Sequence, residues 1–150
     1  MFWTELFRII LATILGGIIG LEREFHGKPA GLRTNLLICL GAAVFTLISK
    51  QMVEGTNDSL TRIASQIVSG VGFLGAGAII QDRGGIHGLT TAATIWLVAS
   101  IGIACGAGLY RLAILTTLIA IFVLIVLGKL AIPFDNYADN YQKRRKNRTE

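Results

Sequence analysis

The sequence predicts an all-α fold, a polytopic bundle of about five transmembrane helices. Apolar residues make up 53% of the 150 residues, charged residues only 15%, and the mean hydropathy is +0.63. A soluble domain carries about a quarter charged residues. The charges also fall into short clusters, separated by uncharged runs that approach the thickness of a bilayer's hydrocarbon core. These observations argue against a soluble enzyme and against a nucleic-acid-binding domain, despite the net charge of +5.

Five apolar runs are the expected spans. They extend from Glu5 to Leu21, Leu36 to Val53, Ile63 to Ile80, Leu89 to Leu109 and Leu112 to Ile132. The first three are near the lower limit of about 17 residues for a spanning helix, so Arg8 and Lys50 are expected to snorkel to the interface. Within the first run, only Arg8 precedes the apolar stretch from Ile9 to Leu15 as a base, and no small-residue cleavage site follows this stretch, which indicates a retained helix and not a signal peptide.

Basic residues set the predicted orientation. Ten lie in the first loop, the third loop and the C-terminal region, against four on the other side. By the positive-inside rule, the C-terminus is expected in the cytoplasm and the N-terminus outside. We therefore expect a transmembrane domain over 1–134 and a basic cytoplasmic tail over 135–150, with no soluble C-terminal domain.

Glycine and proline mark the connections. Gly27 to Gly31, which includes Pro29, is expected to form the first turn, and Gly84-Gly85 to follow the third helix. The fourth and fifth helices are separated by little more than Tyr110-Arg111, which predicts a tight antiparallel hairpin.

Glycines also indicate close helix packing. Gly16 and Gly20 form one G-x-x-x-G motif, and Gly102 and Gly106 form another. A third cluster is formed by Gly70, Gly72, Gly75 and Gly77, and its first three glycines match the dinucleotide-binding fingerprint G-x-G-x-x-G by spacing alone. Its surroundings are apolar and no acid lies about 20 residues later, so the nucleotide interpretation is rejected. A close helix contact or a locally broken helix remains.

Two polar residues of the third span, Arg62 and Gln66, recur at helical spacing. An amide in hydrocarbon is costly without a partner, so Gln66 is expected on the interior face of the bundle. Two roles stay open for it: an ion or proton path, and an interhelical hydrogen bond that only holds the bundle together.

A polar network is expected at the cytoplasmic end. Its expected members are Glu22, Arg23, Arg33, Asn35 and Asp82. Adjacent helical residues do not face each other, so Glu22 and Arg23 are expected to pair outside their own helix. Asp82 is placed at a helix C-terminus, where the macrodipole disfavours an acid unless a cation compensates. Glu22 and Asp82 are thus candidate ligands for hydrated Mg²⁺, with a plain salt-bridge network as the alternative.

Four further residues complete the assignments. Thr90 and Thr91 open the fourth helix and are further candidate members of the functional polar network, as are Arg62 and Gln66, and capping of the helix is the structural alternative for one of the two threonines. Cys39 and Cys105 lie deep in separate apolar runs without metal-ligand spacing, and both are interpreted as small apolar residues.

Several sequence blocks together resemble the MgtC/SapB family of bacterial inner-membrane proteins. The blocks are Gly16 to Arg23, Ala30 to Asn35, Arg62 to Gly70, Gly72 to Gly77, and Gly88 to Thr94. The resemblance implies a role in adaptation to low magnesium and, in pathogens, survival inside host cells. It also implies action through other membrane complexes for some members, and no established transport reaction.

Two functional hypotheses follow. The first is a non-enzymatic membrane protein that contributes to magnesium homeostasis by regulating or binding other membrane components. The second is a cation or proton transporter or channel. An enzyme has little support, because no nucleophile, base and orienting group occur together. The expected partners are the lipid bilayer and a second copy, in a homodimer or small homo-oligomer.

Overall fold

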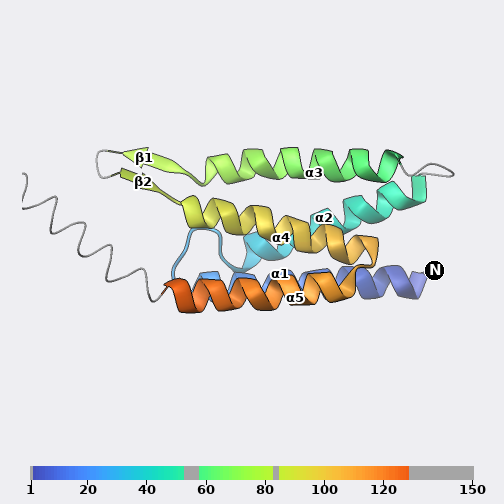
Figure 1. Ribbon diagram of the computed structural model, residues 1–150, viewed down its shortest axis with the longest axis horizontal. Coiled ribbons are helices and arrows are strands. Elements are labelled where there is room, and N and C mark those ends of the chain that lie inside the picture. Colours follow the sequence, from blue (N-terminus) through green and yellow to red (C-terminus); the bar gives the residue numbers. More distant parts are fainter. Residues whose placement is uncertain (1, 53–57, 83–84, 129–150) are drawn as a thin grey trace, which may run out of the picture. The chain divides into compact units, whose positions relative to one another are not determined.

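The computed structural model describes residues 2–52, 58–82 and 85–128, and the side chains of 58–63 and 81–82 lie outside this description. The predicted all-α fold is confirmed: five helices dominate it, accompanied by one short hairpin (Figure 1). The expected tail over 135–150 lies outside the described residues. The chain divides into two units, Met1–Thr117 and Leu118–Glu150.

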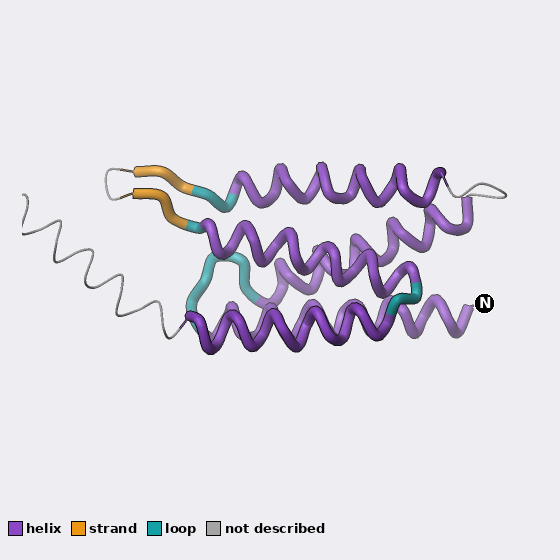
Figure 2. Tube along the Cα trace, in the orientation of Figure 1, coloured by secondary structure: helices purple, strands orange, loops and turns teal. Residues whose placement is uncertain are grey.

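The elements follow one another in a simple order. The helices are α1 (Phe2–Phe25), α2 (Leu32–Met52), α3 (Asp58–Gly77), α4 (Leu89–Ala107) and α5 (Tyr110–Phe122), the last continued by a π-helical segment, Val123–Leu127. The strands β1 (Ile80–Asp82) and β2 (Gly85–His87) pair antiparallel between α3 and α4 (Figure 2).

Four of the helical segments are long and apolar enough to cross a membrane. They are Phe2–Phe25, Leu32–Met52, Leu89–Ala107 and Tyr110–Leu127. The third helix, α3, is not among them within the described residues, so its crossing of the bilayer stays a prediction. Helices α1 and α2 are longer than the runs from which they were predicted, with 24 and 21 residues.

Helix α2 packs between α1 and α4, and small residues make both contacts. A Cβ on Gly16 would lie 2.5 Å from Cys39 Cβ, and one on Gly20 would lie 2.8 Å from Leu32 Cα. On the other side, a Cβ on Gly106 would lie 2.6 Å from Ala43 O, and one on Gly102 would clash with Cys39 O. Both G-x-x-x-G faces are therefore used inside one chain, so they are not spare surface for self-association.

Helix α3 lies beside α4 and contacts α2 over a smaller area (Figure 1). A Cβ built on Gly75 of α3 would be in van der Waals contact with Ala92 of α4. A Cβ built on Gly70, Gly72 or Gly77 would have no neighbouring atom within 4 Å. The helix runs through its glycines to Gly77 without a break. Of the glycine cluster, Gly75 thus makes the close helix contact.

The end of α3 differs from the prediction. The third helix was expected to continue to Ile80, but Ile80–Asp82 forms β1, with Ile80 opposite His87 and Asp82 opposite Gly85. Asp82 therefore lies in a strand and not at a helix C-terminus, so the macrodipole argument does not apply to it.

The connection from α4 to α5 is as short as expected, but it consists of Gly108-Leu109 and not of Tyr110-Arg111. Gly108 ends α4 with a left-handed backbone, φ 90°, and its N–H reaches the carbonyls of Ala104 and Cys105. Because glycine adopts this conformation without steric cost, the chain reverses at once and α5 begins at Tyr110.

Arg8, which was expected to snorkel, makes two hydrogen bonds within the bundle. Its Nη1 donates to Gly106 O at 2.8 Å, and its Nε donates to the Tyr110 hydroxyl at 3.1 Å. The cationic side chain thus meets a carbonyl in the last turn of α4, where the helix macrodipole favours positive charge.

Candidate functional site

The buried charged residues of the described chain gather where α1 ends and α2 begins. Glu22 and Arg23 lie in the last turn of α1 and are 8% and 4% exposed, and Asn35 in the first turn of α2 is 0% exposed. Gly16 and Gly20 bring α2 close enough that a Cβ on Gly20 would lie 3.2 Å from Asn35 Cβ. We call Glu22, Arg23 and Asn35 the polar cluster.

Within the polar cluster, Glu22 and Arg23 pair with each other. Arg23 Nε lies 2.8 Å from Glu22 Oε2, which corrects the expectation that each would pair outside its own helix. Successive helical positions differ by about 100°. The long arginine side chain spans that angle, and burial of both side chains removes competing water. Glu22 Oε1 also lies 3.1 Å from Nδ1 of His26, whose side chain is half exposed.

Hydrogen bonding in the polar cluster is incomplete. Although Arg23 Nε and Glu22 Oε2 are at ion-pair distance, their orientation is not that of a hydrogen bond. Within the described residues, both Glu22 carboxylate oxygens, Arg23 Nε and Nη1, and Asn35 Oδ1 are buried without a hydrogen bond. Each such group costs about 1–3 kcal/mol, so folding stability alone does not account for the arrangement. The polar cluster is the best candidate functional site of the described chain.

Asn35 fixes the loop that closes this site. Its Nδ2 donates to Ala30 O at 2.7 Å and to Gly31 O at 2.9 Å. Next to it, Glu24 Oε2 accepts from Leu32 N at 2.9 Å, at the start of α2. Gly31 leaves the room for this carboxylate, since a Cβ there would collide with Glu24 Oε2. Glu24 was not predicted as a site residue, because it lies in the last turn of α1, eight residues before Leu32, and its spacing gives no signal of this contact.

Arg33 does not join the polar cluster. It is exposed, and within the described residues no ion pair connects it to Glu22. The side chains of Arg62 and Asp82 lie outside the described part, so their predicted roles stay predictions.

Neither threonine of α4 caps that helix. Gly88 occupies the N-cap, without a side-chain cap hydrogen bond. Thr90 is exposed, and Thr91 is 3% exposed. The left-handed backbone of Gly88, φ 85°, follows directly from β2 and moves the helix start upstream of both hydroxyls.

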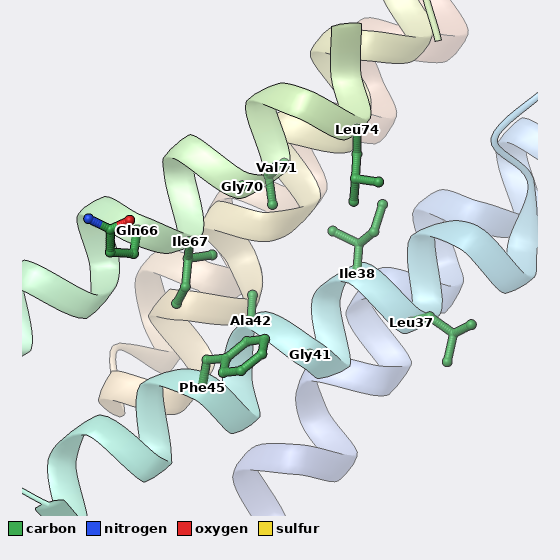
Figure 3. A pocket seen from close by; sticks show the side chains of 10 residues that line it. All are labelled: Leu37, Ile38, Gly41, Ala42, Phe45, Gln66, Ile67, Gly70, Val71 and Leu74. Atoms are coloured by element: carbon green, nitrogen blue, oxygen red, sulfur yellow. The ribbon is translucent and has the colours of Figure 1, made fainter. Parts of the chain in front are cut away.

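Gln66 is exposed, contrary to the expectation of an interior position. It lines a groove of about 490 Å³ between α2 and α3 (Figure 3). The other described lining residues are apolar or glycine: Leu37, Ile38, Gly41, Ala42, Phe45, Ile67, Gly70, Val71 and Leu74. Val71 is the buried residue of this stretch, so the packed face of α3 passes through Val71 and Gly75 and leaves Gln66 to one side.

The polar cluster does not fit a bound Mg²⁺ as it stands. Glu22 faces His26 and the guanidinium of Arg23, which already supplies a positive charge. Across the described residues, no group of three or more His, Cys, Asp or Glu side chains is placed to hold a metal. A divalent cation at Glu22 would have to displace the Arg23 guanidinium.

Comparison with known proteins settles the family. Residues 9–132 match the MgtC family. The chain belongs to the MgtC family. Members are membrane proteins, in agreement with the four candidate spans.

Alignments with named relatives cover most of this chain. It is 51% identical over 112 residues to Protein MgtC of Brucella abortus, covering 75% of this chain and 46% of the relative. It is 46% identical over 123 residues to Protein MgtC of Salmonella typhimurium, covering 82% and 52%. It is 44% identical over 135 residues to the Putative magnesium transporter YhiD of Escherichia coli, covering 86% and 63%.

The chain therefore spans about half to two thirds of the length of these MgtC-family relatives. No solved structure matches it.

Proposed function

We propose that this chain is a non-enzymatic MgtC-type protein of the bacterial inner membrane that contributes to magnesium homeostasis and adaptation to low magnesium. It acts by binding or regulating other membrane components. The observation that carries the proposal is the family match over residues 9–132, together with relatives named for MgtC and for magnesium transport.

The distribution of buried polar groups favours this role over conduction. A conduction path needs polar groups or water along its length. The described centre of the bundle is instead filled by small and apolar side chains, among them Ile19, Cys39, Val98, Ile101 and Cys105. The hydroxyls of three buried threonines bond to carbonyls of their own helices: Thr46 to Ala42, Thr94 to Thr90 and Thr117 to Ala113.

The polar cluster is assigned to the cytoplasmic side. The ten-to-four asymmetry of basic residues supports an N-terminus outside and a C-terminus inside. In that orientation the end of α1 and the start of α2 face the cytoplasm. A partner acting from that side would meet the loop that Asn35 and Glu24 hold in place.

A cation transporter is the second candidate. The name of the Escherichia coli relative, Putative magnesium transporter YhiD, favours it. In that case Glu22 would be the carboxylate that meets the ion, after Arg23 moves away from it.

Growth at limiting magnesium tests the proposal. The chain is expressed in a strain that lacks its own MgtC-family protein, and wild-type protein is expected to restore growth. Glu22→Gln keeps the shape but removes the charge, and it is expected to lose the rescue. Glu5→Gln is the matched control, because Glu5 is bound by Gln51 at the other end of the helices. Failure of membrane-inserted wild-type protein to rescue would refute the proposal.

A further inference from the structure

The groove between α2 and α3 contains an amide at hydrocarbon depth. Gly41, Ala42 and Phe45 line it and lie at the middle of α2. This helix has 21 residues and is long and apolar enough to cross a membrane. Gln66 lines the same groove from α3 (Figure 3). It is therefore level with the middle of α2, where no water is available to hydrogen-bond an exposed amide.

Gln66 makes no hydrogen bond within the described part of the chain, and the groove around it offers apolar side chains. An unpaired amide in hydrocarbon is costly, so a partner outside this chain is favoured. A lipid acyl chain can fill an apolar groove, but it has no group that hydrogen-bonds an amide.

We infer that the α2/α3 groove is the contact surface for a second copy of this chain, with Gln66 paired to Gln66 of the partner. An amide carries both a donor and an acceptor, so two glutamines pair reciprocally. Two copies with the same orientation, related by a twofold axis along the bilayer normal, place Gln66 at the same depth in each. The self-complementary chemistry of the amide thus favours a second copy as the occupant.

The groove also permits close approach. Gly41 on one wall and Gly70 on the other have no atom within 4 Å of a Cβ position. Small residues of this kind let helix backbones come near each other in lipid. The two G-x-x-x-G faces are used inside the chain, whereas this face is open and available for association.

The inference is tested by energy transfer between donor- and acceptor-labelled copies of the protein in phosphatidylethanolamine/phosphatidylglycerol vesicles. Increasing amounts of lipid dilute the protein in the bilayer. Wild-type protein is expected to associate. Gln66→Leu is expected to weaken association about tenfold, the scale of a transmembrane hydrogen bond, and Gln66→Asn to restore part of it. Gly70→Leu fills the groove and is expected to abolish association.

Gly72→Leu is the matched control. It lies on the same helix, is equally open and does not line the groove, so its association is expected to equal that of wild type. The inference would be overturned if Gln66→Leu and Gly70→Leu associated as strongly as wild type. It would also be overturned if Gly72→Leu lost as much association as Gly70→Leu. A wild-type monomer at every dilution would also overturn it. If native mass spectrometry then showed a bound lipid that Gly70→Leu loses, the occupant would be an acyl chain.

Discussion

Asn35 shows how a single residue supports the site. It is fully buried, and its side chain holds the carbonyls of Ala30 and Gly31. Asn35→Ala is expected to lower the free energy of unfolding by about 1–3 kcal/mol, because buried hydrogen bonds are lost. Thermal unfolding in mild detergent measures it. Thr34→Ala, an exposed neighbour, is the control. Equal shifts for the two variants would show that Asn35 does not hold the loop.

Arg8 supports a different end of the bundle. Arg8→Met removes the hydrogen bonds to Gly106 O and to the Tyr110 hydroxyl. Since hydrogen bonds from a charged group contribute about 1.5–3 kcal/mol, a loss of that size is expected. Tyr110→Phe removes only one of the two and should cost less. Unfolding of both variants in detergent ranks them, and a larger effect for Tyr110→Phe would contradict the assignment of Arg8.

At the residue scale, the sequence located part of the polar cluster. Arg23 follows Gly20 by three positions and Gly16 by seven, so helical periodicity placed it on the packed side of α1. The pairing of Glu22 with Arg23 was not predictable from spacing, because it depends on burial by α2. The position of Gln66 was missed for a similar reason: the polarity of Gln66 suggested the interior, but Val71 and Gly75 determine which face of α3 is packed.

At the element scale, the glycines make contrasting predictions. Gly102→Ala would place a methyl against Cys39 O in the α2–α4 contact and is expected to destabilise by about 1–3 kcal/mol. Gly72→Ala meets open space in a helix and is expected to be neutral or to stabilise by up to about 1 kcal/mol. Urea unfolding in detergent measures both. If both variants lowered, or both raised, the free energy of unfolding, the result would contradict the packing described here.

The helices themselves were predictable, but their partners were not. Apolar runs locate α1, α2, α4 and α5, whereas nothing in either G-x-x-x-G motif states that both pack on α2. The hairpin was missed because Ile79 and Ile80 extend the apolar run of α3. Its sequence signal is Ile80 and Ile86 on either side of Gly84-Gly85.

For the whole molecule, orientation is the first prediction. A fluorescent protein fused after Glu150 is expected to fluoresce, because the asymmetry of basic residues predicts a cytoplasmic C-terminus. Alkaline phosphatase fused at the same point should be inactive. Active phosphatase with no fluorescence would reverse the orientation and move the polar cluster to the outer side.

Magnesium flux into proteoliposomes tests most directly whether the protein serves magnesium homeostasis without conducting the ion itself. Purified chain is reconstituted with a magnesium-sensitive dye inside the vesicles, and Mg²⁺ is added outside with an inward gradient and a negative internal potential. Since the described core is packed and the polar cluster is confined to one end, dye response is expected to equal that of protein-free vesicles. Uptake that rises with the amount of protein and is lost in Glu22→Gln would contradict this account and establish a transporter.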